Sequence, residues 1–282
     1  MELVARLAVF AFVVASMSSV GLSLSFGEIH EPFKSPRLVL RALTANFIAV
    51  PLLAYLITKA IPVNPSLMIA LMLLGTASGA PMLPKLVEFA KGNLALAVGL
   101  MGLLMATTVV YVPLVLPMLL PGVHAQAWSI AKPLLGVTLP PLLVGLAVRA
   151  YRKEIASRLA RHLRVASNIT LLVVISAAIA VNYSNVIQMS SLEAIAAGAT
   201  LFLGSFGIGF ALAGGNAETR MVLGLGAIVR NVSVSFLIAV ENFRESKVVN
   251  YVAILGLVAV LIQLPVARLL GTRVPRQTLS AE

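Results

Sequence analysis

Nine long apolar runs occupy most of this 282-residue chain and limit the folds that it can adopt. A helix needs about 20 consecutive apolar residues to cross a membrane. The runs also lack the two-residue alternation of transmembrane barrel strands, so the sequence predicts helices. We therefore expect an all-α polytopic membrane protein with one membrane domain over residues 1–282. The expected transmembrane helices cover residues 3–25, 37–60, 66–90, 93–120, 128–150, 165–185, 190–213, 218–242 and 247–270.

The composition excludes several other classes of protein. Only 11% of the residues are charged, whereas a soluble domain carries about 25%, and the 60% hydrophobic content is also unlike a disordered chain. The net charge of +11 would suggest nucleic acid in a soluble protein. Here it indicates loops that face anionic lipid, so the bilayer is the expected partner and nucleic acid is not. The absence of cysteine excludes disulfides and thiolate metal sites.

Lysine and arginine gather in alternate connections between the spans, as they do on the cytoplasmic side of membrane proteins. Fourteen of them lie on one side and five on the other, and the most basic connection runs from 149 to 164. With nine spans, this bias predicts an external N-terminus and a cytoplasmic C-terminus.

Two of the expected spans, 66–90 and 218–242, contain glycine, proline or polar residues at membrane depth. Such residues interrupt the helical hydrogen bonds, and freed backbone groups persist in a membrane only where they line a cavity or are buried in protein. Interrupted helices in corresponding places of two halves are typical of inverted-repeat transporters, although glycines also permit close helix packing. The residues expected at the breaks are Gly75, Gly79, Pro81 and Pro84 in the first span and Gly224 and Gly226 in the second.

Arg230 lies twelve residues from each end of the eighth expected span. An arginine at the centre of a bilayer costs at least about 3 kcal/mol, so it needs an anionic or a carbonyl partner. Its guanidinium suits a carboxylate, sulfate or phosphate group of a substrate, or it forms a structural ion pair, for which Glu88 is a candidate. Lys85 and Glu88 are also spaced to pair with each other. The other candidate site residues are the polar Asn46, Thr76, Ser78, Asn231 and Ser233.

The order and spacing of several motifs resemble the bile acid:sodium symporter family over nearly the whole chain. The resemblance implies a panel domain of the first, fifth and sixth helices and a core domain of the other six. It also implies crossed third and eighth helices, alternating access, and small organic anions such as bile acids, steroid sulfates, pantoate or pyruvate as substrates. The motifs are 21-GLSLSF-26, 35-SPRL-38, 45-ANFIAVP-51, 90-AKGNLAL-96 and 230-RNVS-233.

The chain departs from the family where sodium is bound. Gly226 stands in place of a glutamate and Arg230 in place of a glutamine, while Leu83 and Pro84 replace a Ser-Asn pair. Because sodium prefers several oxygen ligands, including a carboxylate, we expect no cofactor and no bound sodium. Our hypothesis is that Arg230 substitutes for the ion, either by holding the crossing together with Lys85 or by meeting the substrate anion.

Three other functions stay open at this stage. The chain is a transport-inactive receptor or sensor if the lost ion sites mean lost turnover, or a sodium-coupled symporter that uses other ligands. A carrier of the auxin-efflux or arsenite-efflux type is a further alternative, although the latter typically uses a cysteine. An enzyme is not expected, because all three histidines lie in expected loops and no Gly-x-Ser-x-Gly or His-Glu-x-x-His motif occurs.

Overall fold

The computed structural model describes residues 2–23, 35–119, 127–181, 191–243 and 246–273. Within these ranges the regular structure is helical, and the extended backbone pairing is a single antiparallel bridge between Ser78 and Arg230. The elements are α1 (Glu2–Ser23), α3 (Pro36–Thr44), the π-helix η2 (Ala45–Ala49), α4 (Val50–Ala60), α5 (Pro65–Thr76), α6 (Leu83–Phe89), α7 (Leu94–Leu119), α8 (Ala127–Tyr151), α9 (Lys153–Val181), α11 (Leu192–Leu212), α12 (Ala217–Ile228), α13 (Val232–Asn242) and α14 (Ser246–Arg273).

Among the described residues, four helices are long and apolar enough to cross a membrane. Two shorter apolar helices, Phe10–Ser23 and Pro65–Thr76, accompany them. These findings confirm the prediction of an all-α membrane protein, while the number of nine spans stays a prediction. The four helices are Pro36–Ala60, Leu94–Val112, Leu192–Leu212 and Lys247–Thr272.

Helix starts follow ordinary capping chemistry. The side-chain oxygen of Asn64 accepts a hydrogen bond from the backbone N–H of Leu67 at 2.9 Å, at the start of α5. At α12, Asn216 does the same for Thr219 at 2.8 Å. These bonds satisfy backbone donors that lack a partner in the first turn of a helix. Each capped helix then runs toward one of the two breaks.

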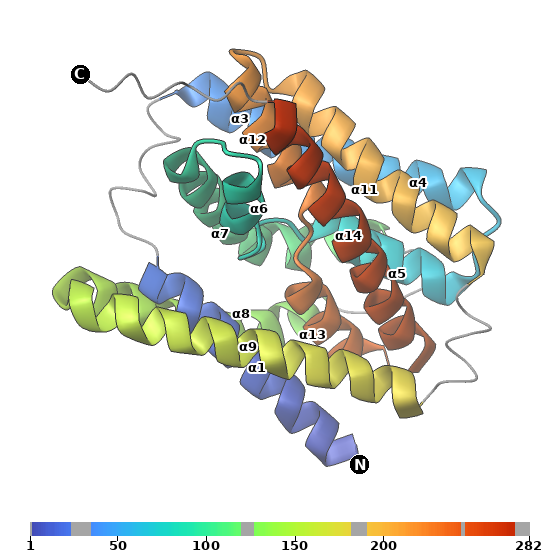
Figure 1. The fold of residues 1–282 in the computed structure, drawn as a ribbon. Helices are drawn as coiled ribbons and strands as arrows, with labels where there is room; N and C mark the ends of the chain where they lie inside the picture. Colours follow the sequence, from blue (N-terminus) through green and yellow to red (C-terminus); the bar gives the residue numbers. More distant parts are fainter. Residues whose placement is uncertain (1, 24–34, 120–126, 182–190, 244–245, 274–282) are drawn as a thin grey trace.

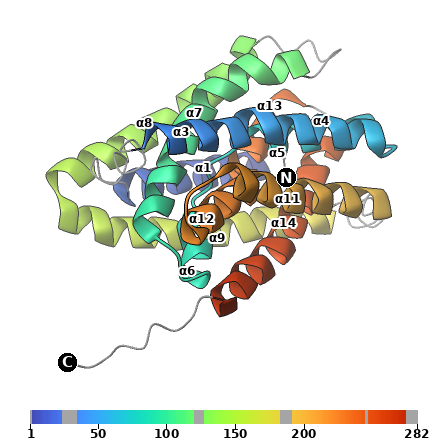
Figure 2. The same ribbon diagram turned by 90° about the horizontal axis from the view of Figure 1, so that it is seen from above.

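The helices form two groups. α1 packs mainly against α8 and α9, and Figure 1 shows these three helices together below the rest of the molecule. The other group contains α11, which contacts α12, α14 and α4. Figure 2 shows α3 and α4 as one continuous helix that runs alongside α11. Between the groups lies α13, which contacts α1 and α8 as well as α5 and α14.

Both spans that were expected to be interrupted contain a break. The span 66–90 is divided into α5 and α6, and the span 218–242 into α12 and α13. In the first break Gly79 has a φ of 76°, Pro81 lies in a turn, and Pro84 lies in the first turn of α6, where proline is tolerated.

The prediction that three further glycines break the helices is wrong. Gly75 lies within α5, and Gly224 and Gly226 lie within α12. A Cβ atom added at Gly75 would lie 2.6 Å from Ala54 Cβ, and one added at Gly226 would lie 2.7 Å from Leu100 Cδ2. At these positions glycine permits close helix packing, which was the alternative interpretation.

Candidate functional site

The two broken helices meet at their unwound segments. The backbone N–H of Asn231 donates to the carbonyl of Ala77 at 3.0 Å, and Ser78 and Arg230 form the antiparallel bridge. The Asn231 side-chain amide donates to the carbonyl of Gly79 at 3.1 Å. Ser78, Arg230 and Asn231 are all buried. We call these two segments, residues 77–82 and 229–231, the crossing.

Asn231 also starts the helix that leaves the crossing. Its side-chain oxygen accepts from the backbone N–H of Val234 at 3.2 Å and so caps α13. One asparagine side chain therefore satisfies a donor of its own helix and an acceptor of the other break. This double role fixes the two segments relative to each other.

The Arg230 guanidinium is surrounded by oxygen atoms of the protein. Its Nε donates to the Leu74 carbonyl at 3.0 Å. Its Nη1 donates to Asn46 Oδ1 at 3.0 Å and to the Ala227 carbonyl at 3.1 Å. Its Nη2 donates to the Gly75 carbonyl at 2.8 Å and makes a longer contact of 3.5 Å with the Asn46 carbonyl. A guanidinium has five N–H donors, so these contacts occupy them all.

The acceptors around Arg230 are neutral, and their positions explain how a buried charge is stabilised. Leu74 and Gly75 lie in the last turn of α5, and Ala227 lies in the last turn of α12. The carbonyl groups at a helix C-terminus carry partial negative charge. Two helix ends therefore stabilise the guanidinium, which is 2% exposed.

Asn46 connects a third helix to the crossing. It lies in η2, where the widened turn interrupts the α-helix between α3 and α4. Its Oδ1 accepts from Ser78 Oγ at 2.8 Å as well as from Arg230, and its Nδ2 donates to the Ala42 carbonyl at 3.0 Å. The side chain is thus held in one orientation, with its oxygen toward the crossing.

Two residues of the site were not selected from the sequence. Thr108 of α7 accepts from the backbone N–H of Ser78 at 3.0 Å, and its hydroxyl donates to the Ser78 carbonyl at 2.9 Å. Gln263 of α14 donates from Nε2 to the Ile228 carbonyl at 3.0 Å. Their signal in the sequence is a polar side chain within an apolar run, which more often marks a contact between helices.

Replacing Thr108 by valine is expected to destabilise the protein, because Ser78 then loses partners for both its backbone N–H and its carbonyl. Each buried group left without a partner costs about 1–3 kcal/mol. Thermal unfolding of the purified protein in detergent measures the effect. Thr107→Val is the matched control, since the Thr107 hydroxyl donates only to the Leu103 carbonyl of its own helix. Equal losses in the two variants would contradict the assigned role.

Two predicted site residues lie elsewhere. Lys85 Nζ and Glu88 Oε2 form an ion pair at 2.7 Å on α6, and their side chains are 54% and 55% exposed. Glu88 is therefore not the partner of Arg230, and Lys85 does not help it to hold the crossing. Both predictions are wrong because the helix after the first break directs these side chains to the surface.

The remaining candidates are buried close to the breaks. The Thr76 hydroxyl donates to the carbonyls of Met72 and Leu73 within α5, at 2.8 and 3.2 Å. Ser233 lies in the first turn of α13 and is 8% exposed. The structure thus brings Asn46, Ser78, Arg230 and Asn231 into direct contact and leaves Thr76 and Ser233 at the edges of the crossing.

Residues 10–189 match the family model described as the Sodium Bile acid symporter family. The chain belongs to this family. The matched residues include Asn46 and the first break and end before Arg230. The protein is therefore a homologue of transporters, and its apolar helices are those of an integral membrane protein.

Curated relatives are consistent with this family. The chain is 24% identical over 195 residues to the probable sodium/metabolite cotransporter BASS3, chloroplastic, of Oryza sativa subsp. japonica, covering 69% of this chain and 46% of that protein. It is also 24% identical over 185 residues to the uncharacterized sodium-dependent transporter YocS of Bacillus subtilis, covering 63% of this chain and 56% of that protein. The chain spans about half the length of the curated relatives it matches.

The oxygen atoms around the Arg230 guanidinium are suitable in kind for a hard cation, but the guanidinium already uses them. Sodium would require carbonyl and amide oxygens such as those of Leu74, Gly75 and Asn46. In the structure these oxygens accept hydrogen bonds from Arg230. A second cation at this place would also repel the guanidinium. The residues present therefore do not fit a sodium ion beside Arg230.

Proposed function

We propose that this protein is a secondary transporter of small organic anions that works by alternating access, with Arg230 in the role of a permanently bound cation. The observation that carries the proposal is the set of five oxygen contacts around the Arg230 guanidinium. Membership of the family supports transport. The basic connections support an external N-terminus and a cytoplasmic C-terminus.

In this proposal Arg230 is a positioning residue. All its N–H groups point at protein oxygens, and its side chain is 2% exposed, so it does not meet the substrate directly. It holds the ends of α5 and α12 and the π-helix η2 as one unit. Its positive charge still favours an anion at the crossing, because buried charges are weakly screened.

The division into a panel and a core gives the substrate its access route. We assign α1, α8 and α9 to the panel, since α1 packs mainly against the other two. The remaining helices form the core. Because α13 of the core contacts α1 and α8, movement of the panel relative to the core would change the contacts of the helix that begins at the crossing and holds Ser233 in its first turn. The substrate region that we propose comprises Asn46, Thr76, Ser78, Asn231 and Ser233, and Arg230 lies behind it as the positioning residue.

A second candidate is a sodium-coupled symporter whose ligands lie away from Arg230. It is favoured by the names of the relatives, one a probable sodium/metabolite cotransporter and one a sodium-dependent transporter. A transport-inactive sensor is the third candidate. The three candidates differ in whether the rate of transport depends on sodium and in whether the substrate is transported at all.

Uptake into proteoliposomes distinguishes these candidates. The substrates are a bile acid, a steroid sulfate, pantoate and pyruvate, each with and without an inward sodium gradient. We expect uptake of at least one anion at the same rate under both conditions. Uptake that requires the gradient would replace our proposal with the sodium-coupled candidate. Binding of an anion, detected as a thermal shift, without any uptake would favour the sensor.

A further inference from the structure

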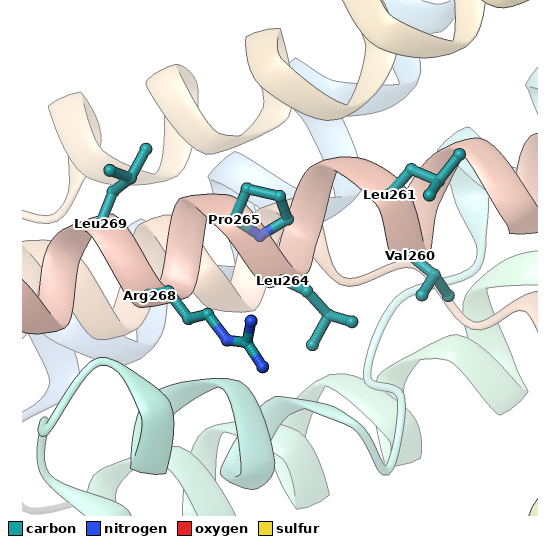
Figure 3. Close-up of a pocket in the computed structure, with 6 residues that line it drawn as sticks. All are labelled: Val260, Leu261, Leu264, Pro265, Arg268 and Leu269. Atoms are coloured by element: carbon teal, nitrogen blue, oxygen red, sulfur yellow. The ribbon is translucent and has the colours of Figure 1, made fainter.

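A groove runs along the outward face of α14, and no residue of the crossing lines it. Its volume is about 470 Å³. Figure 3 shows that α14 itself supplies the side chains of the groove. Because α14 contains the candidate span Lys247–Thr272, this face lies at membrane depth. The groove is lined by Val260, Leu261, Leu264, Pro265, Arg268 and Leu269.

One end of this apolar groove carries a cation. In Figure 3, Arg268 and Leu264 project from the same side of α14. The Arg268 guanidinium lies 5.9 Å from the centre of the Phe89 ring of α6, and Lys85 Nζ lies 5.0 Å from the same ring. Glu88 neutralises Lys85. Within the part of the chain that the structure describes, Arg268 has no carboxylate partner, so its charge is available to a ligand.

We propose that the groove binds an anionic phospholipid, with the phosphate on Arg268 and one acyl chain along Leu264 and Val260. A guanidinium binds phosphate oxygens through paired hydrogen bonds. Eight residues separate Val260 from Arg268, which is about 12 Å along a helix. One leaflet contains about 15 Å of hydrocarbon, so the chain and the phosphate both lie at their natural depths.

The site is held in place by contacts between α14 and α6. Gly271 lies so close to α6 that an added Cβ atom would be 3.3 Å from Ala90 Cα. The other side of α14 carries Gln263, which donates to the Ile228 carbonyl at the end of α12. A lipid in the groove therefore packs on the helix that supports the crossing. We expect its binding to stabilise the folded protein.

Native mass spectrometry of the protein purified in mild detergent tests the proposal with phosphatidylglycerol and phosphatidylcholine as probes. The wild type is expected to retain phosphatidylglycerol in preference to phosphatidylcholine. In Arg268→Gln, retention should fall about fivefold, the effect of one basic residue near a lipid surface. Arg37→Gln, which removes another exposed arginine, is the control and should retain phosphatidylglycerol as the wild type does.

Two further measurements distinguish binding of a whole lipid from binding of its phosphate alone. Val260 is 41% exposed in the groove, so Val260→Trp should fill the space for the acyl chain and lower retention while Arg268 is unchanged. Inorganic phosphate should not compete with the lipid. Equal retention of the two lipids, unchanged retention in Arg268→Gln, or displacement by phosphate alone would each overturn the proposal. These experiments do not measure uptake. A failure of the lipid proposal is therefore distinct from a failure of the proposed transport function.

Discussion

Arg230→Met is expected to abolish anion uptake and to lower the free energy of unfolding by at least about 3 kcal/mol, because several buried acceptors lose their partners at about 1–3 kcal/mol each. Methionine has a similar length but no donor. The carbonyls of Leu74, Gly75 and Ala227 and the Oδ1 of Asn46 would then lose their hydrogen bonds. Thermal unfolding in detergent measures the loss, and a shift of several degrees is expected for a protein of this size.

Two other arginine substitutions make this result specific. Arg230→Lys keeps the charge but has three donors in place of five, so an intermediate loss is expected. Arg41→Met is the control, because among the described residues Arg41 donates to the Ala213 carbonyl at the end of α11 and does not contact the crossing. The Arg41→Met loss should be about 1.5 kcal/mol or less, the net value of one hydrogen bond. If Arg230→Met unfolds at the temperature of the wild type, Arg230 does not hold the crossing.

The effect of sodium on a third substitution at Arg230 provides a further test. In Arg230→Gln the oxygens released by the guanidinium are of the kind that hard cations prefer. We expect sodium, compared with choline, to raise the unfolding temperature of this variant and to leave that of the wild type unchanged. A sodium effect of equal size in both proteins would mean that the ion binds away from Arg230.

The breaks and the buried arginine could be predicted from the sequence because each stands out locally. Proline and glycine residues in an apolar run interrupt a helix wherever the run is placed, and Arg230 is conspicuous at the centre of a span. The partner of Arg230 could not be predicted in the same way. Its acceptors are mostly backbone carbonyls, which every residue has, so no pattern of side chains indicates which ones face the guanidinium.

Other parts of the site depend on contacts between distant segments. Ser78 and Thr108 are thirty residues apart, and their hydrogen bonds exist only because α7 passes beside the first break. Whether a glycine breaks a helix or permits close helix packing also depends on contacts between distant segments. Gly75 lies four residues before Gly79, yet the first permits close helix packing and the second takes the left-handed conformation of the break. Residue type alone does not separate these two uses.

Gly79→Ala is expected to prevent normal folding, although it adds one methyl group. At Gly79 φ is 76°, in the left-handed region that side chains disfavour. The added Cβ would also lie 2.7 Å from the Leu104 carbonyl carbon and 2.8 Å from Met105 Cα. Both are backbone atoms of α7, so rotation of a side chain cannot relieve the contact. Backbone strain and overpacking each cost about 1–3 kcal/mol.

The backbone of α7 has little freedom to move away from that methyl group. The same helix holds Thr108, whose hydroxyl bonds both backbone groups of Ser78, so a shift of α7 would break the contacts that support the crossing. The measurement is the yield of monodisperse protein on size-exclusion chromatography together with its unfolding temperature. Gly207→Ala is the control, because an added Cβ meets nothing within 4 Å there, and alanine favours a helix by up to about 1 kcal/mol. Similar yields and unfolding temperatures for the two variants would show that the first break does not lie against α7 as described.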